Sequence, residues 1–179
     1  MKEIRDSGPR AGNSGGRTEC NEADRPVSGT PSEQRPRFRI LLIDDMEPLL
    51  RILEKGLQRY GHTVFTGSSG QEGLEIVKSR PIDAVVCDLG MPGMDGWRVA
   101  QAVKDYCREQ GISKISFILL TGLGASISHT ARDLRQLGVD AMLEKPVEIL
   151  VLIQTVAEAV QISLKEHAED DAESSLGPI

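Results

Sequence analysis

Short runs of apolar residues alternate with amphipathic stretches between residues 37 and 164. The first run, FRILLI at 38–43, is too continuously apolar for a half-exposed strand and is typical of a strand covered on both faces. The intervening stretches repeat apolar residues at helical spacing. This alternation predicts an α/β fold, a doubly wound five-stranded parallel sheet with helices on its faces. The expected strands are residues 38–43, 62–66, 82–87, 115–120 and 139–143.

Prolines, glycines and polar residues give the expected limits of the helices. Pro48 suits the first turn of a helix, and leucines together with Ile52 then recur at helical spacing until Gly61. The other helices are expected over 69–79 and 97–107, from a cap at Ser126 or Ser128 to near Gly138, and over 147–164.

The two ends of the chain differ in composition from the middle. Residues 1–36 contain 13 Gly, Pro and Ser, with balanced charge and few large aliphatic side chains. Such a segment buries too little apolar surface to offset the entropy of ordering it. Residues 165–179 carry five acidic side chains against one lysine. We therefore expect a disordered leader at 1–36, one folded domain at 37–164 and a disordered acidic tail at 165–179.

The charge and the cysteines exclude several classes of protein. The formal net charge is −6, which disfavours the phosphate contacts of nucleic-acid binding. No apolar run approaches the roughly 18 residues that a membrane span requires. The cysteines, Cys20, Cys87 and Cys107, are odd in number and too widely spaced for a zinc site or a CxxC redox pair. These features fit a reducing cytoplasm, with neither nucleic acid nor membrane as a direct partner.

Polar residues follow the predicted strands at the points where the strands end. Asp44 and Asp45 leave the first strand, and Asp88 leaves the third. Thr121 leaves the fourth, and Lys145 leaves the fifth. Ligands of open α/β sheets bind beyond the carboxyl ends of the strands. We therefore expect these five side chains to form one site.

Three carboxylates at one site require a compensating positive charge. Two unit charges about 4 Å apart interact by about 4 kcal/mol at an effective dielectric near 20. Mg²⁺ provides this charge with oxygen ligands and leaves room for a phosphate oxygen, and Lys145 adds a second cation. A carboxylate in such a site can attack phosphorus and form an acyl phosphate. We predict that Asp88 is the nucleophile, because the Gly/Pro loop after it leaves access for in-line attack.

Each of these residues also has an ordinary structural interpretation. Taken singly, Asp44 and Asp45 are a helix N-cap pair. Asp88 before a Gly/Pro loop is a turn former, and Lys145 is a surface residue at a strand end. Their occurrence together, in order and at the expected strand ends, favours a functional site.

Four motifs resemble the receiver domain of bacterial two-component response regulators. They are Ile-Asp44-Asp45, Asp88-Leu-Gly-Met-Pro-Gly-Met-Asp-Gly96, Leu-Leu-Thr121-Gly and Glu-Lys145-Pro146, and they cover about 38–160. The resemblance implies a flavodoxin-like (βα)5 fold. It implies that Asp88 accepts the phosphoryl group and that Asp45, Asp88 and the Gly90 carbonyl bind Mg²⁺, with Asp44 acting through water. It also implies that Thr121 and Lys145 contact the phosphoryl group, and that the Lys145-Pro146 peptide is cis.

The resemblance further implies a phosphorelay role. The phosphoryl donor is expected to be a sensor histidine kinase or a histidine phosphotransfer protein, and the domain is a phosphoacceptor that takes part in its own phosphorylation and dephosphorylation. No output domain is recognisable after the last predicted helix, so a stand-alone receiver that signals through an unknown downstream protein is expected. The expected docking face comprises the fourth helix, the fifth strand and the fifth helix, with Arg132, Arg135 and Met142 on or near it.

Two positions depart from the family pattern. Met142 replaces the usual aromatic side chain, and Gly122 replaces the alanine that often follows the threonine. The threonine in this family is thought to move together with the aromatic ring, and a flexible methionine packs less specifically. We therefore expect the signal to depend on ordering of the loop at 122–128 more than on rotation of a ring.

Three other functions compete with this interpretation. A phosphatase of the haloacid-dehalogenase kind would carry an aspartate two residues after the nucleophile, where Gly90 stands. A pseudo-receiver that only mediates interactions would be expected to lose acidic or lysine residues, and none of the five is missing. The receiver portion of a hybrid sensor kinase remains an alternative.

Overall fold

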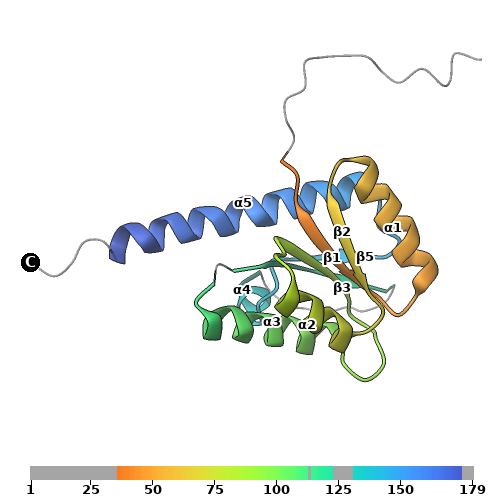
Figure 1. The fold of residues 1–179 in the computed structure, drawn as a ribbon, viewed down its shortest axis with the longest axis horizontal. Coiled ribbons are helices and arrows are strands. Elements are labelled where there is room, and N and C mark those ends of the chain that lie inside the picture. Colours follow the sequence, from red (N-terminus) through yellow and green to blue (C-terminus); the bar gives the residue numbers. More distant parts are fainter. Residues whose placement is uncertain (1–35, 113, 123–130, 175–179) are drawn as a thin grey trace, which may run out of the picture. The chain divides into compact units, whose positions relative to one another are not determined.

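The computed structural model describes residues 36–112, 114–122 and 131–174, with side chains described up to Lys165 except for those of 131–133. Five strands form one parallel sheet in the order β2-β1-β3-β4-β5 (Figure 1). The strands are β1 Arg39–Ile43, β2 Thr63–Gly67, β3 Ala84–Asp88, β4 Ser116–Thr121 and β5 Ala141–Glu144. The predicted α/β fold with five parallel strands is confirmed.

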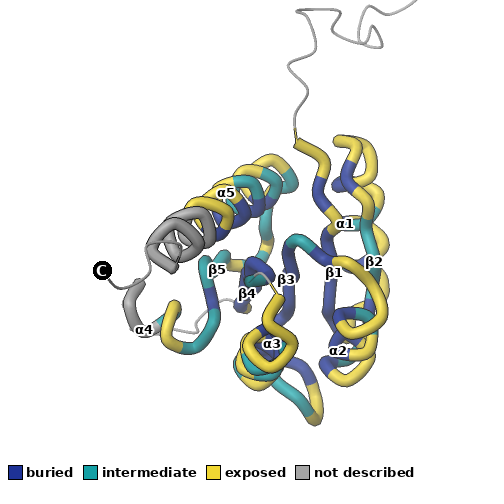
Figure 2. Tube along the Cα trace, turned by 60° about the vertical axis from the view of Figure 1, so that its left-hand side comes forward, coloured by how far each residue is buried: buried dark blue, intermediate teal, exposed yellow. Residues whose placement is uncertain are grey.

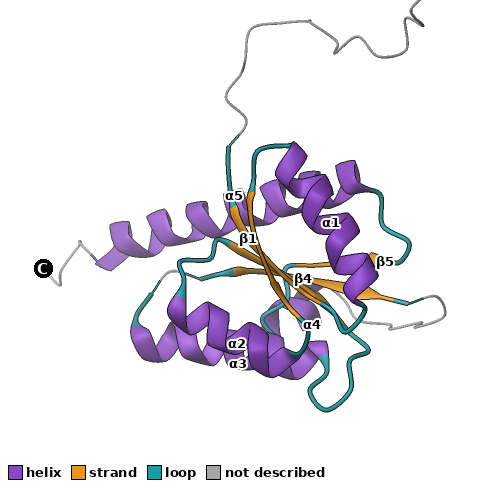
Figure 3. Cartoon of the chain, turned by 45° about the vertical axis from the view of Figure 1, so that its right-hand side comes forward, coloured by secondary structure: helices purple, strands orange, loops and turns teal. Residues whose placement is uncertain are grey.

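Helices cover both faces of the sheet. The helices are α1 Glu47–Arg59, α2 Gly70–Ser79, α3 Gly96–Gln110, α4 Ala131–Gln136 and α5 Ile149–Ser174. Figure 3 shows α1 and α5 on one side of the strands and α2 and α3 on the other. Alternate residues of the central strands therefore point into two separate apolar clusters, one containing Leu42 and Val86 and the other Leu41 and Val85.

The central strands are the most buried part of the domain. All described positions of β3 and β4 are buried, whereas those of β5 at the edge are intermediate or exposed (Figure 2). This difference explains why the sequences of the central strands are continuously apolar. On α1, Leu50, Leu53 and Leu57 face the core, whereas Ile52 is 67% exposed. The helical spacing therefore identified the buried face of α1 but included one side chain that lies outside it.

The helix limits follow local capping. The hydroxyl of Ser69 accepts from the Glu72 N–H at the start of α2. The Asp95 carboxylate does the same for Arg98 at the start of α3, and Gly111 ends α3 with a φ of +60°. Because of these caps, α3 begins earlier and ends later than the predicted 97–107. The proposed caps of the fourth helix, Ser126 and Ser128, lie outside the described residues.

The last helix is longer than expected. α5 continues to Ser174, so residues 165–174 are helical where a disordered tail was predicted. Lysine, glutamate and alanine in this segment favour helix, and extending an existing helix carries no new nucleation cost. The expected disorder of residues 1–35 and 175–179 lies outside the described residues. No helix in the described part of the chain has both the length and the apolar character needed to cross a bilayer.

Two ion pairs join the strands at their amino ends. The Asp83 carboxylate accepts from the backbone N–H of Arg39 at 2.7 Å and from its Nε at 3.0 Å, which links β1 and β3. The Asp140 carboxylate accepts from Lys114 Nζ at 2.6 Å and from the Phe117 N–H at 2.8 Å, which links β4 to the start of β5. Each carboxylate therefore has one cation and one backbone donor of its own.

Candidate functional site

The carboxyl ends of four strands bring the predicted site residues to one edge of the sheet. Asp44 and Asp45 follow β1, and Asp88 is the last residue of β3. Thr121 is the last residue of β4, and Lys145 follows β5. Parallel strands end at the same edge, so residues that lie far apart in the sequence become neighbours.

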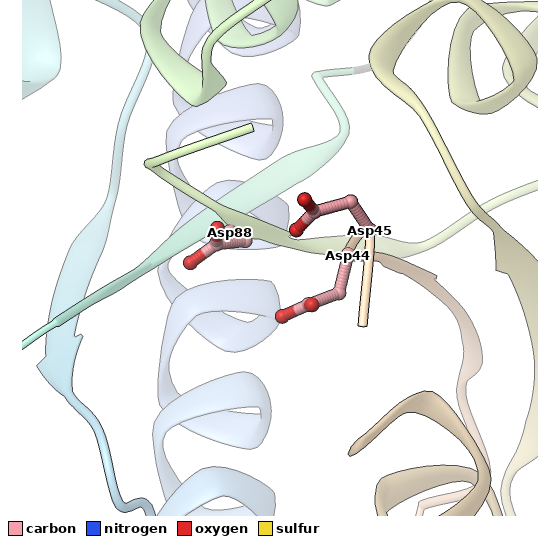
Figure 4. Close-up of side chains that lie close together, drawn as sticks. All are labelled: Asp44, Asp45 and Asp88. Carbon is pink, nitrogen blue, oxygen red and sulfur yellow. The ribbon is translucent and has the colours of Figure 1, made fainter. Parts of the chain in front are cut away.

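The three aspartates form a cluster. One carboxylate oxygen from each of Asp44, Asp45 and Asp88 lies within 4.8 Å of the other two. Figure 4 shows the three side chains reaching from the two strand ends toward a common space. Asp44 and Asp88 are buried, with 2% and 8% exposure, whereas Asp45 is exposed. The cluster is therefore open to solvent on the side of Asp45.

Lys145 lies against the buried half of this cluster. Its Nζ is 2.6 Å from Asp44 Oδ2 and 2.7 Å from Asp88 Oδ1. Burial by itself lowers the pKa of Lys145, but the hydrogen bonds to the two carboxylates outweigh burial and raise its pKa above the ordinary value. Lys145 is therefore charged at neutral pH and links the ends of β1, β3 and β5.

Backbone donors hold the second oxygen of each buried carboxylate. Asp44 Oδ1 accepts from the Met46 N–H at 2.8 Å, and Asp88 Oδ2 accepts from the Gly90 N–H at 3.1 Å. These bonds fix both carboxylates before any ligand arrives. Asp45 makes no hydrogen bond or ion pair with the described residues, so three formal negative charges share one ammonium group.

The donor set fits Mg²⁺. All three side chains offer hard oxygen ligands, which Mg²⁺ prefers. A spread of up to 4.8 Å suits an ion that contacts some carboxylates directly and others through water, as Mg²⁺ commonly does. The excess negative charge favours a divalent cation over a monovalent one. These residues can therefore hold the ion that the sequence predicts.

Thr121 lies beside the cluster but does not bond to it. Its side chain is buried, and its hydroxyl donates to the Gly122 carbonyl at 3.3 Å. Its own carbonyl accepts from the Lys145 N–H at 2.7 Å, which sets the end of β4 next to Lys145. The Lys145–Pro146 peptide is cis, as the resemblance implies. The structure therefore brings the three aspartates and Lys145 into contact and places Thr121 at the neighbouring strand end.

Gly96 closes one of the four motifs, and no role was predicted for it. A Cβ atom at Gly96 would lie 2.6 Å from the Asp88 carbonyl oxygen and 3.0 Å from Leu89 Cα. Only glycine allows the start of α3 to approach the end of β3 this closely. The signal in the sequence was the Asp-Gly pair at 95–96, because aspartate there caps α3 and glycine permits the contact.

Cys87 precedes Asp88 and faces the core. Burial, together with the neighbouring Asp88 carboxylate, raises the pKa of the Cys87 thiol far above its ordinary value. Cys107 is also buried. Both cysteines are therefore packing residues of the core.

Comparison with known proteins identifies the family. The model of the response regulator receiver domain matches residues 40–157. The chain belongs to this family. The virulence sensor protein BvgS of Bordetella pertussis is 29% identical over 134 residues, covering 75% of this chain and 11% of BvgS. The transcriptional regulatory protein AfsQ1 of Streptomyces coelicolor is 28% identical over 137 residues, covering 76% of this chain and 57% of AfsQ1.

Solved receiver structures agree with this assignment. A response regulator receiver domain protein from Clostridium thermocellum is 29% identical, with a TM-score of 0.61 over 69% of this chain and 94% of that one. The FixJ-N crystal structure is 26% identical, with a TM-score of 0.59 over 71% of this chain and 96% of that one. The flavodoxin-like receiver fold expected from the sequence is confirmed.

The relatives also show where such domains occur. They include the virulence sensor protein BvgS, the sensor histidine kinase GacS of Pseudomonas protegens and the transcriptional regulatory protein AfsQ1. Similarity to this receiver domain, a phosphoacceptor of two-component signalling, is thus found in both sensor and regulatory proteins. This chain spans only about a tenth of the length of BvgS. The expected stand-alone arrangement therefore remains a prediction.

Proposed function

We propose that this receiver domain accepts a phosphoryl group on Asp88 from a phosphohistidine of a sensor histidine kinase or a histidine phosphotransfer protein. The observation that carries the proposal is the contact of Lys145 with the two buried members of a three-carboxylate cluster, with Asp88 Oδ1 only 2.7 Å from Nζ. Asp44, Asp45, Asp88 and the Gly90 carbonyl would hold Mg²⁺. When bound, Mg²⁺ neutralises negative charge on the transferring phosphoryl group.

The residues of the chain supply the remaining parts of the reaction. Asp88 attacks phosphorus as the carboxylate, so an O–P bond forms while the N–P bond to the donor histidine breaks, and the histidine nitrogen retains that electron pair. The Gly90 N–H holds Asp88 Oδ2, which leaves Oδ1 as the attacking oxygen. Lys145 then moves from that oxygen to an oxygen of the phosphoryl group, where its charge offsets the added negative charge.

Thr121 completes the contacts to the phosphoryl group. Its hydroxyl donates to a neighbouring carbonyl in the structure, and that bond at 3.3 Å is long for a hydroxyl donor. Rotation toward the site would exchange this weak bond for a charge-assisted one. The resulting movement at the end of β4 is a means to pass the signal to the following loop.

The output is proposed to pass through another protein in the cytoplasm. The docking face would comprise α4, β5 and α5. Met142 on β5 is half-buried and packs against the core on the side of α2 and α3. Arg135 lies at the end of α4, and the side chain of Arg132 lies outside the described residues. The predicted ordering of the loop at 122–128 also falls almost entirely outside them and stays a hypothesis.

A second arrangement has specific support. The similarity to BvgS and GacS favours the receiver portion of a hybrid sensor kinase as the alternative context for this domain. The chemistry at Asp88 would be the same in that case, and the donor would be a histidine of the same protein or of a phosphotransfer partner. A pseudo-receiver is less well supported, because the acidic cluster and Lys145 are both complete.

Mass spectrometry of the intact chain after incubation with acetyl phosphate tests the proposal. The wild type with Mg²⁺ is expected to gain a single phosphoryl adduct, and Asp88→Asn or added chelator is expected to abolish it. Asp105→Asn is the matched control, since Asp105 pairs with Arg108 on α3 and is not part of the cluster. A folded wild type that binds Mg²⁺ yet gains no adduct would establish the pseudo-receiver instead.

A further inference from the structure

A cavity of about 410 Å³ lies at the opposite end of the domain from Asp88. It opens between the carboxyl-terminal half of α3, the start of β4 and the segment that follows α4. Its apolar walls are formed by Val103, Cys107, Ile112 and Ile115. The volume is within the range of roughly 300–1,000 Å³ that small-molecule sites occupy. We call this cavity, with its basic rim described next, the basic pocket.

Basic side chains surround this apolar interior. The rim is formed by Lys104, Arg108, Lys114 and Arg135, and no acidic side chain is among the described residues that line the pocket. Such a concentration is unusual in a chain whose net charge is −6. Arg108 and Lys114 are each paired with an aspartate, so Lys104 and Arg135 supply the excess positive charge around the apolar cavity.

The four cations differ in their present partners. Lys104 Nζ donates to the Gln136 carbonyl at 2.6 Å, and Lys114 pairs with Asp140. Arg108 pairs with Asp105 on the exposed face of α3. Arg135 makes no hydrogen bond or ion pair with the described residues. Its guanidinium group is therefore the rim group most available to an anion.

A second cavity next to the basic pocket is also lined by apolar and basic side chains. This second cavity, of about 470 Å³, shares Ile112 and Ile115 with the basic pocket. It is lined by Arg39 and Arg80 and, among the described residues, by no acidic side chain. Ile112 between the two cavities is 44% exposed. A ligand with an apolar body therefore finds apolar contacts that continue beyond the first cavity.

Helix dipoles explain only part of this pattern. The last turns of α1, α2, α3 and α4 each contain a basic residue, which are Arg59, Lys78, Arg108 and Arg135. Cations at these positions offset the partial negative charge of a helix end. That effect accounts for Arg108 and Arg135, and also for Lys104, which donates to the last carbonyl of α4, but it accounts neither for Lys114 nor for the apolar cavity that all four surround.

We propose that the basic pocket binds a small organic anion with an apolar body. The anionic group would lie at the rim near Arg135 and Arg108, and the apolar body would pack on Val103, Cys107 and Ile112. Charge complementarity and the apolar walls both favour this class over a cation or a neutral polar molecule. The site is separate from the phosphorylation site and is independent of the function proposed for Asp88.

Titration of the ¹⁵N-labelled 179-residue chain with octanoate, followed by amide chemical shifts, tests the inference. Saturable shifts are expected at Val103, Cys107 and Gly138, which line the pocket, whereas octylammonium is expected to give none that saturate. Mg²⁺ and phosphoryl donors are omitted, so the outcome does not depend on phosphorylation. Absence of saturation with octanoate, or equal binding of octylammonium, would overturn the proposal.

Charge reversal separates ligand binding from helix stabilisation. Arg135→Glu is expected to raise the dissociation constant for octanoate by about tenfold. Lys78→Glu is the matched control, because Lys78 also lies in the last turn of a helix but does not line the pocket. It is expected to change affinity by less than about twofold. An equal loss in both variants would contradict a local site. If the spectrum of Arg135→Glu shows unfolding, Arg135→Gln replaces it, with an expected loss of about threefold.

Discussion

At the amino ends of the strands each carboxylate has its own cation, whereas at the carboxyl ends three carboxylates share Lys145. Asp83 is paired with Arg39, and Asp140 is paired with Lys114. Both pairs also include a backbone N–H from a neighbouring strand. At the other end, Asp44, Asp45 and Asp88 have between them one ammonium group from the described residues, that of Lys145.

This difference separates structural from functional charge. Burial raises the pKa of Asp83, but the hydrogen bonds and charge of Arg39 outweigh burial and hold its pKa below the ordinary value. A balanced pair of this kind stabilises the folded state by itself. The cluster carries more negative than positive charge, so its exposed member, Asp45, is repelled by Asp44 and Asp88 until a cation binds. Removing Asp45 should therefore have the opposite effect on stability to removing Asp83 or Asp140.

The largest effect on stability is expected from Asp140→Ala, at the amino ends of the strands. The substitution removes the acceptor of the buried Phe117 N–H together with the carboxylate that pairs with Lys114 at 2.6 Å. An unsatisfied buried donor and the lost charged hydrogen bond should lower the free energy of unfolding by about 3 kcal/mol. Urea denaturation measures this change.

Asp140→Asn is the matched control for that experiment. It keeps an oxygen acceptor for the Phe117 N–H and removes only the charge. Its cost should be about 1 kcal/mol, because Lys114 is 37% exposed and water screens the pair. An ordinary surface substitution changes stability by up to about 0.5 kcal/mol. A cost below that value for Asp140→Ala would contradict the structural role of the Asp140–Lys114 pair.

Mg²⁺ should stabilise the folded domain only through the aspartate cluster at the carboxyl ends of the strands. At a concentration tenfold above its dissociation constant, a ligand of the native state alone stabilises it by about 1.4 kcal/mol. We expect this increase in the wild type and in Asp83→Asn, but not in Asp88→Asn. Thermal unfolding with and without Mg²⁺, at constant ionic strength, measures the difference. Equal stabilisation of all three proteins would show that Mg²⁺ acts elsewhere.

Asp45→Asn should have a smaller effect on the free energy of unfolding, opposite in sign to the effect of the substitutions at Asp140. Asp45 adds negative charge to the cluster without a hydrogen bond or ion pair among the described residues. Removing that charge should raise the stability of the metal-free protein by about 0.5 to 1 kcal/mol at low salt, since Asp45 is exposed and screened. Urea denaturation in chelator measures the gain. A destabilised Asp45→Asn would show that the cluster is not under electrostatic strain.

Most of the site at the carboxyl ends of the strands was predictable, because the sequence signals that mark its residues are local. A continuous apolar run followed at once by a polar residue marks both a buried strand and the residue at its end, as at Asp88 and Thr121. The two ion pairs at the amino ends of the strands gave no such signal in the sequence. Asp83 lies 44 positions from Arg39, and Asp140 lies 26 from Lys114, so nothing in the sequence joins the partners. The length of α5 was missed because charge was taken as a sign of disorder, although those residues favour helix.

The smallest expected effect is the pH dependence of stability that comes from His62. This residue lies near the amino ends of the strands and contributes a neutral ring. His62 is 8% exposed, and its Nδ1 accepts from the Phe38 N–H at 3.3 Å. The ring stacks on Phe38 with a centroid distance of 5.7 Å. Protonation of Nδ1 would set two donors against each other, and burial lowers the pKa of His62 below 6.5.

The sign of the pH dependence follows from this lowered pKa. The unfolded chain takes up a proton on His62 near pH 6.5, whereas the folded domain resists it until lower pH. Stability from His62 is therefore complete well above the unfolded pKa near 6.5 and declines as the pH falls through the lower pKa of the folded domain. His62→Asn keeps an acceptor near Nδ1 but does not titrate. The decline between pH 7.5 and 5.5 should therefore be smaller in this variant, and an equal decline in both proteins would assign the effect to other groups.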